Sequence, residues 1–184
     1  LSDKKSINGR GCRVLSLEER LSKLEDRAAI QDLVARYFLA TDDDNWPVMA
    51  ECFTADADFE ASGYEGGSGR DGIMAFLKMA RSAMGQTVHT INYAHVTLDG
   101  GDDAHGTVTA HLELGMGGST VYGAVRYIDR YRRDGGVWRI SARKMRAVYI
   151  GGLDELPSLL CDPLNVRWPG AEPQPSELPR PKPA

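Results

Sequence analysis

The sequence predicts an α+β domain in which a curved antiparallel sheet forms a cone around three N-terminal helices. Apolar residues recur at helical intervals in three stretches before residue 85, and four long runs rich in Val, Thr, Tyr and Ile follow from residue 86. Short turns rich in Gly and Asp separate these runs, and such turns join antiparallel neighbours. Helices followed by a meander of strands are typical of a domain whose helices lie on one side of the sheet.

The first helix is predicted for the segment "SLEERLSKLEDRAAIQDLVARYFLA". Ser16 and Glu19 have the spacing of a capping box, which satisfies free amide groups at a helix N-terminus. Eight apolar residues then recur at helical intervals and predict a long amphipathic helix: Leu17, Leu21, Leu24, Ala28, Leu33, Val34, Tyr37 and Phe38.

The remaining elements follow in order along the chain. A short helix is predicted over 47–53, since it opens on a proline, which suits a first turn. "ADADFEASG" alternates as a strand does, a Gly-rich loop follows at 63–69, and "DGIMAFLKMARSAM" predicts a third helix over 71–84. The four strands of the meander are predicted at 86–98, 104–116, 119–133 and 136–150.

The domain is predicted to span residues 16–152, with other kinds of segment outside it. Residues 1–15 lack periodicity and residues 169–184 are rich in proline, so both are predicted to be flexible tails. The segment 153–168 spaces leucines among polar residues after a Gly pair, and it is predicted to be a lid or an oligomer contact. Deleting only residues 170–184 is therefore expected to change little.

Composition excludes several classes of protein. The chain has 184 residues, 42% hydrophobic and 26% charged, which is typical of one soluble globular domain. A net charge of -4 with scattered basic residues argues against nucleic-acid binding. No apolar run approaches the ~18 residues that span a bilayer, so no membrane contact and a cytoplasmic location are expected. Cys12, Cys52 and Cys161 are predicted to be free thiols, without a metal site.

The four histidines fall on two predicted strands. Residues of equal parity share a face, so His89, Tyr93 and His95 would line one side of their strand. His105 and His111 belong to a set that alternates with apolar residues and is expected to face solvent. His89 is the candidate for function, because its strand must cover the helices. A half-buried histidine bonded to the backbone is the alternative.

Three stretches resemble a known family: "RAAIQDLVARYFLATDDDNW", "VHTINYAHVTLDG" and "YRRDGGVWRISARKMR". They are similar to the SnoaL-like family of the nuclear transport factor 2-like fold. Within this family they most resemble the hexachlorocyclohexane dehydrochlorinases, the scytalone dehydratases and the bile-acid 7α-dehydratases. The resemblance covers roughly residues 17–152. It implies a cone-shaped fold, usually oligomeric, that needs neither metal nor organic cofactor.

The resemblance also implies a set of site residues. The carboxylate at the helix end falls on Asp42, the catalytic histidine on His89, an arginine of the last strand on Arg143, and a tyrosine of some dehydratases on Tyr37. A carboxylate beside an imidazole holds one tautomer and improves it as a general base, so Asp42 would orient and His89 would abstract a proton. Four aromatic residues are expected to bind substrate: Phe38, Trp46, Tyr93 and Tyr149.

Alternatives remain for three of these residues. Asp42 could instead cap a helix end or the turn that follows. Arg143, on the same predicted strand face as Tyr149, could hold a leaving group or an enolate oxygen, or it could pair at the surface with Asp129 or Glu113. Tyr37 could donate a hydrogen bond to substrate or be an ordinary core aromatic.

The function implied is a cofactor-independent lyase, a dehydratase or related eliminase. Its substrate would be a hydrophobic alicyclic, steroid-like or polyketide-like small molecule, and the chain would form a homo-oligomer, a trimer or a dimer. An isomerase or cyclase would use the same first step. The same fold also serves as the non-catalytic small subunit of ring-hydroxylating dioxygenases and as a binding module, because fold alone does not decide function.

Overall fold

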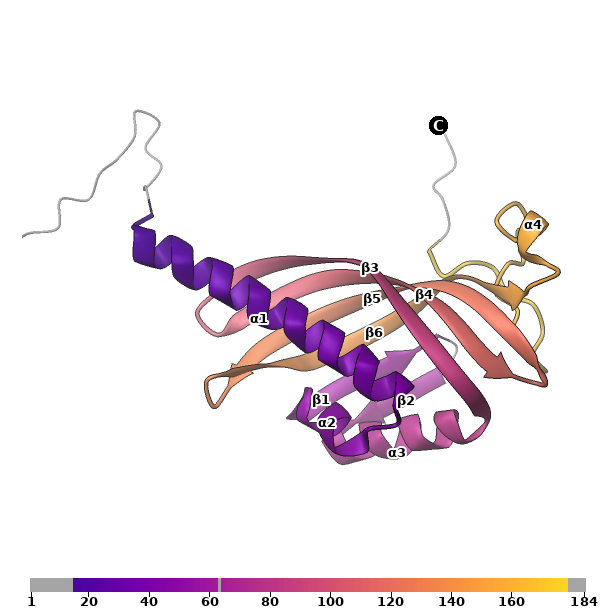
Figure 1. Ribbon diagram of the computed structural model, residues 1–184, viewed down its shortest axis with the longest axis horizontal. Coiled ribbons are helices and arrows are strands. Elements are labelled where there is room, and N and C mark those ends of the chain that lie inside the picture. Colours follow the sequence, from indigo (N-terminus) through magenta and orange to yellow (C-terminus); the bar gives the residue numbers. More distant parts are fainter. Residues whose placement is uncertain (1–14, 63, 179–184) are drawn as a thin grey trace, which may run out of the picture.

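The protein is described by a computed structural model that covers residues 15–62 and 64–178. Its sheet has six strands in the order β2-β1-β6-β5-β4-β3 (Figure 1). The helices are α1 (Leu17–Asp42), α2 (Trp46–Glu51), α3 (Gly69–Ser82) and α4 (Leu156–Leu159), and the strands are β1 (Phe53–Ala61), β2 (Tyr64–Ser68), β3 (Met84–Gly100), β4 (Asp103–Met116), β5 (Ser119–Asp134) and β6 (Val137–Gly152).

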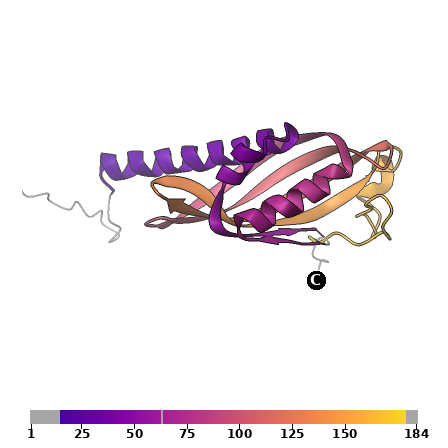
Figure 2. The ribbon, with the colours of Figure 1, turned by 90° about the horizontal axis from the view of Figure 1, so that it is seen from below.

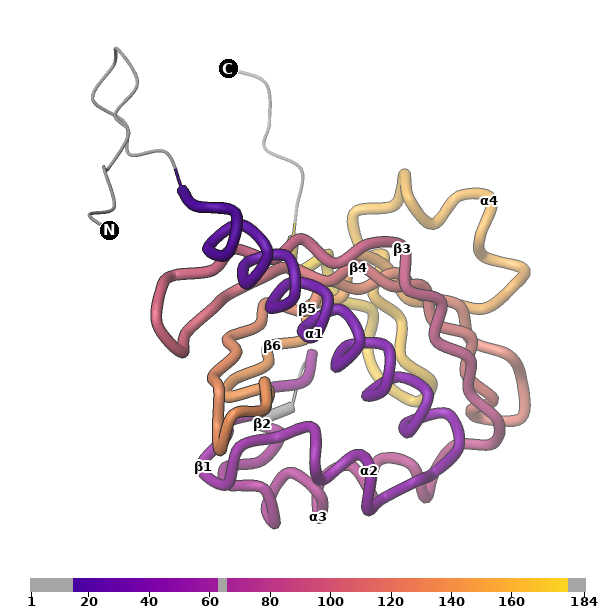
Figure 3. The backbone as a smooth tube through the Cα atoms, turned by 60° about the vertical axis from the view of Figure 1, so that its left-hand side comes forward, coloured from indigo at the N-terminus to yellow at the C-terminus, as the bar shows by residue number. Residues whose placement is uncertain are grey.

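The sheet curls around the interior, and α1 and α3 close its open side (Figures 2 and 3). The α+β prediction and the four-strand meander are confirmed, although one pairing, β1 with β6, is parallel. Apolar side chains of the helices and of the inner sheet face form one core, as expected of two packed layers. Within the described ranges, no helix is long and apolar enough to cross a membrane.

Helix α1 begins as predicted but buries only part of its apolar sequence. Ser16 caps the helix, its hydroxyl accepting from the Glu19 amide while the Glu19 carboxylate accepts from the Ser16 amide. From Ile30 onward its inner face is buried against the sheet. The first leucines of the predicted amphipathic helix lie on the face opposite Ile30 and are not buried: Leu17 is 77% exposed, Leu21 53% and Leu24 62%.

The Gly-rich segment 63–69 was predicted to be a loop, yet most of it forms the edge strand β2. Its glycines allow an approach that other residues would block. A Cβ at Gly66 would lie 1.9 Å from the carbonyl oxygen of Phe59, and Gly66 has a φ of 69°. A Cβ at Gly67 would lie 2.6 Å from the backbone of Gly72 in α3. The glycines therefore serve close packing of strand and helix, not flexibility.

Bulges in the long strands change which side chains face inward. On β3 the pairing with β4 skips Asn92. Odd-numbered residues such as His89 face inward before this bulge, and even-numbered residues such as Ala94 face inward after it, so Tyr93 is 56% exposed. The prediction that His89, Tyr93 and His95 share a face is therefore wrong. On the adjoining β4, His105 and His111 are exposed, as predicted. An inserted residue reverses the alternation of a strand, and a strict two-residue period does not anticipate it.

The C-terminal segment crosses back over the sheet. Val166 bridges Ile150 and Gln174, and the Glu177 carboxylate accepts hydrogen bonds from the Ala147 amide and the Ser62 hydroxyl. The prediction of a free tail from residue 169 is thus corrected for 169–178, because backbone pairing and this carboxylate attach it. The predicted tails at 1–14 and 179–184 lie outside the described residues.

Candidate active site

Asp42 and His89 meet where the end of α1 crosses β3. Atom Nδ1 of His89 lies 2.6 Å from Oδ1 of Asp42. Two more donors hold the carboxylate: the Thr87 hydroxyl donates to Oδ1 at 2.8 Å, and the His89 amide donates to Oδ2 at 2.9 Å. The expected contact between the two side chains is confirmed. Because α1 and β3 are far apart in sequence, only the packed domain brings them together.

The first of the three consecutive aspartates does not cap a helix. Asp43 occupies the C-cap of α1, and the Asn45 side chain caps α2 by accepting from the Val48 amide at 3.4 Å. The alternative that Asp42 is a cap is therefore wrong. Asp44, the third aspartate, pairs instead with Arg81 of α3 and holds a left-handed backbone with a φ of 50°.

The electrostatics of the pair keep Asp42 ionised at neutral pH. Burial raises the pKa of its carboxyl, but hydrogen bonds and charge interaction with His89, together with the Thr87 hydroxyl, outweigh it and place the pKa below its usual value. A carboxylate that accepts the Nδ1–H leaves the lone pair of His89 on Nε2. No side chain or backbone group of the described chain hydrogen-bonds to that nitrogen.

This pKa shift predicts how the pair affects stability. A carboxyl with a lowered pKa in the folded state stabilises the protein fully above its unfolded pKa of about 3.9, and this contribution is lost as the pH falls through the folded value. Urea unfolding of wild type and Asp42→Asn should therefore show a stability gap that does not narrow between pH 7 and about pH 5 and that narrows below about pH 4. A gap that narrows between pH 7 and pH 5 would contradict the assignment.

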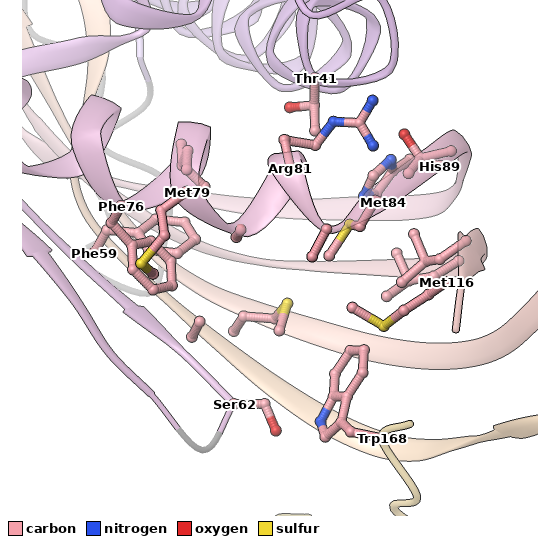
Figure 4. A pocket seen from close by; sticks show the side chains of 18 of the residues that line it. Thr41, Phe59, Ser62, Phe76, Met79, Arg81, Met84, His89, Met116 and Trp168 are labelled. Carbon is pink, nitrogen blue, oxygen red and sulfur yellow. The ribbon is translucent and has the colours of Figure 1, made fainter. Parts of the chain in front are cut away.

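A cavity of about 330 Å³ lies beside the pair, between α3 and the inner sheet face (Figure 4). His89, Thr41 and Arg81 lie near one end of it, and Ser62 and Trp168 lie across from them. Its wall is mostly apolar and contains five of the six methionines of the chain: Met49, Met79, Met84, Met116 and Met145. Methionine is flexible and polarisable, so such a wall adapts to irregular apolar ligands.

Arg81 is a polar lining residue that the sequence reasoning missed. It lies in the last turn of α3, its guanidinium donates to both carboxylate oxygens of Asp44, and its Nη1 donates to the Gly85 carbonyl at 3.1 Å. It thereby ties the end of α1 to the start of β3, the two elements that carry Asp42 and His89. The sequence offered no signal for it beyond a basic residue near a helix C-terminus.

Arg143 lies behind the cavity wall and does not line the cavity. It is fully buried and pairs bidentately with Asp129, Nε to Oδ1 at 2.9 Å and Nη2 to Oδ2 at 2.7 Å. Its guanidinium stacks 4.3 Å from the Tyr37 ring and 4.7 Å from the Tyr127 ring, and both of these rings do line the cavity. The alternative that Arg143 pairs with Asp129 is confirmed, but the pair lies in the core and not at the surface.

The predicted aromatic residues divide into one lining residue and four others. Tyr37 lines the cavity, and burial raises the pKa of its hydroxyl, which is therefore a neutral donor. Phe38 stacks on the imidazole of His89 with ring centroids 5.2 Å apart, outside the cavity lining. The other three residues do not line the cavity either. Trp46 lies under the Lys78 ammonium, and Tyr93 is exposed by the β3 bulge. Tyr149 follows a second bulge, at Val148 of β6, which turns its side chain away from the face of Arg143.

The C-terminal segment contributes to the wall. Trp168 and Pro169 line the cavity, and Arg167 next to them is held by Glu155 at 2.5 Å and by Asp162 at 2.6 Å. The periodicity of leucines suggested an apolar contact for this segment, but it did not single out Trp168.

No group of three or more His, Cys, Asp or Glu side chains in residues 15–62 and 64–178 could hold a metal ion.

Comparison with known proteins gives first the class of fold and then the family. An NTF2-like protein of Novosphingobium aromaticivorans is similar to the chain at 28% identity with a TM-score of 0.59, over 70% of this chain and 86% of that one. A family model described as a SnoaL-like domain matches residues 22–144, and the chain therefore belongs to the SnoaL-like domain family.

Two further solved structures are similar to the chain. LinA, a hexachlorocyclohexane dehydrochlorinase, is 25% identical with a TM-score of 0.69, over 73% of this chain and 93% of that one. A candidate scytalone dehydratase of Novosphingobium aromaticivorans is 17% identical with a TM-score of 0.66, over 71% and 89%. The latter likeness shows the fold alone. Among curated proteins, no sequence matches significantly.

Proposed function

We propose that the protein is a cofactor-independent lyase that removes a proton from a carbon of an apolar small molecule and expels a leaving group. The observation that carries the proposal is the Asp42–His89 pair at the wall of an apolar cavity. A surface ion pair of this kind would contribute little and would not need three hydrogen bonds to its carboxylate. The relative LinA, a hexachlorocyclohexane dehydrochlorinase, supports the same reaction class.

In this mechanism, Nε2 of His89 takes the proton from carbon. Asp42 accepts the Nδ1–H, holds the ring in the productive tautomer and stabilises the imidazolium cation that forms. Phe38 stacks on the ring and limits its rotation. The electron pair of the broken C–H bond forms a carbon–carbon double bond, and the leaving group departs with its own electron pair.

The negative charge that develops on the leaving group requires a donor. Tyr37 lines the cavity and remains a neutral phenol, so we assign it the hydrogen bond to the departing hydroxyl or halide. Arg143 acts one layer further out, because its guanidinium stacks on the rings of Tyr37 and Tyr127 instead of reaching the cavity. It is proposed as a positioning residue.

The cavity wall favours a hydrophobic alicyclic or polycyclic substrate that carries one polar group near His89. A volume of about 330 Å³ lies at the lower end of small-molecule sites. An isomerase or cyclase would use the same proton abstraction, and the same pair of residues supports it as the second candidate. We retain a homo-oligomer as the expected assembly.

Deuterium exchange tests the proposal without knowledge of the leaving group. The protein is incubated in D₂O with a panel of alicyclic ketones, β-hydroxy ketones and chlorinated cyclohexanes, and NMR follows exchange at carbon and release of product. Exchange or elimination that depends on the protein supports a general base facing the cavity. An olefin with loss of hydroxide or chloride identifies a lyase, whereas exchange with a shifted double bond identifies an isomerase. If no member of the panel exchanged deuterium or released product, the result would count against both the lyase and the isomerase.

Removing the indole of Trp168 should weaken ligand binding. The side chain supplies apolar wall opposite His89, so Trp168→Ala is expected to cost about 1–2 kcal/mol of binding, roughly 5- to 30-fold in Kd. Titration with a fluorescent naphthalene dye measures the change. Leu160→Ala is the matched control, because Leu160 belongs to the same segment but is 68% exposed. Equal Kd values for wild type and Trp168→Ala would remove Trp168 from the site.

A further inference from the structure

An unpaired apolar stripe runs along the outer face of the N-terminal half of α1. The stripe consists of Leu17, Leu21, Leu24 and Ala28, all of them exposed. At 100° per residue it lies roughly 150° around the helix from Ile30, whose side chain is fully buried in the core. The apolar residues of this segment therefore cannot contact their own domain.

The N-terminal half of α1 is nevertheless held firmly by its other side. The Asp26 carboxylate accepts hydrogen bonds from Arg133 and, at 3.0 Å, from the indole of Trp138. The capping box at Ser16 closes the first turn. The helix continues beyond the ends of the nearest strands in Figure 1, so its outer face is open to another molecule. A preformed helix loses little conformational entropy when it pairs.

The spacing of the stripe is that of a coiled-coil seam. Intervals of four, three and four residues place Leu17 and Leu24 at d positions and Leu21 and Ala28 at a positions of a heptad repeat. In the same register, the flanking e positions are all acidic and the g positions are basic: Glu18, Glu25 and Asp32 at e, and Arg20 and Arg27 at g. All five are exposed, and none makes an ion pair within the described part of the chain.

This charge pattern selects both the partner and its orientation. In a parallel pair of helices, a g residue faces the e residue five positions later on the other helix. Arg20 would then face Glu25 of a second copy, and Arg27 would face Asp32 of that copy. In an antiparallel pair, e would face e and g would face g, so acidic residues would meet acidic ones.

We infer that α1 pairs in parallel with α1 of a second copy of this chain through Leu17, Leu21, Leu24 and Ala28. The seam is only 12 residues long, about 18 Å at 1.5 Å per residue, so the interface is small and the association weak. The inference does not depend on the proposed reaction, because the stripe lies outside the cavity lining.

Sedimentation velocity on the full chain, from about 1 to about 300 µM, tests the pairing. The mass of the species should double with rising concentration, and Leu21→Glu with Leu24→Glu should raise the dissociation constant at least tenfold. Ser22→Glu with Ala29→Glu is the matched control, because it adds the same charges to the same exposed helix outside the stripe. Circular dichroism melts check that all variants fold. A mass that does not double, or doubling that survives Leu21→Glu with Leu24→Glu, would overturn the inference.

Charge reversal and crosslinking test the orientation. Glu25→Arg should weaken association roughly 3- to 10-fold, and adding Arg20→Glu should restore it, since the two charges then exchange places. In a background with Cys12→Ser and Cys161→Ser, Leu17→Cys should form a disulfide between copies. An antiparallel pair would separate these positions by about 16 Å, too far for a disulfide. Failure of both the rescue and the crosslink would rule out the parallel arrangement.

Discussion

His89→Ala should abolish most of the turnover while the fold remains intact. Loss of a general base costs a factor on the order of 10² to 10⁴, and His89 is the only histidine that lines the cavity. The side chain is partly accessible and packs on Phe38, so its loss should change the free energy of unfolding only modestly. Rates of deuterium exchange and of product formation on the substrate found in the panel measure the first effect, and thermal melting measures the second.

Asp42→Asn separates orientation from proton abstraction. An amide can still accept from a ring N–H but does not stabilise the imidazolium cation, so we expect a loss of turnover smaller than that of His89→Ala. His111→Ala is the control, because His111 is exposed on the outer face of β4 and should keep full activity. Full activity in His89→Ala would show that another group abstracts the proton and would end the proposed mechanism.

Much of the fold could be predicted because its signals are local. The capping box at Ser16, the change of period near residue 85 and the turns between the long strands depend on neighbouring residues, and the structure places elements there. The contact between Asp42 and His89 was predicted from a family resemblance. Their separation along the chain is too great for periodicity alone to join them.

The incorrect predictions of which side chains face inward have two physical causes. A bulge inserts a residue and reverses the alternation of a strand, and α1 carries apolar residues on two faces, of which only one packs on the sheet. A bulge at Asn92 exposes Tyr93, and one at Val148 moves Tyr149 out of the face of Arg143. Such bulges depend on cross-strand pairing, which a single strand does not encode. Likewise, Leu21 and Ile30 both satisfy helical spacing, but only the position of the sheet decides which of them is buried.

Breaking the pair of Arg143 and Asp129 should destabilise the protein more than any change at the cavity surface. Both side chains are fully buried, and the Tyr131 hydroxyl also donates to Asp129 at 2.7 Å. Asp129→Ala leaves a guanidinium charge in the core without its anion, which costs about 3–5 kcal/mol. In the intact pair, burial lowers the pKa of Arg143 but Asp129 raises it more, so it lies above its usual value. An arginine side chain is not deprotonated in proteins, so the variant keeps the guanidinium charge. Urea unfolding measures the loss.

Three further variants distinguish a structural pair from a catalytic arginine. Replacing both partners, Asp129→Leu with Arg143→Met, removes both charges together, so it should cost clearly less than Asp129→Ala alone. Asp56→Ala breaks only an exposed pair with Arg132 and should leave the unfolding midpoint unchanged. If Arg143→Met unfolded like wild type yet lost deuterium exchange to the same degree as His89→Ala, the guanidinium would have to reach the substrate. If instead stability falls and the folded fraction keeps most of its exchange rate, Arg143 acts by holding Tyr37 and Tyr127 in place behind the cavity.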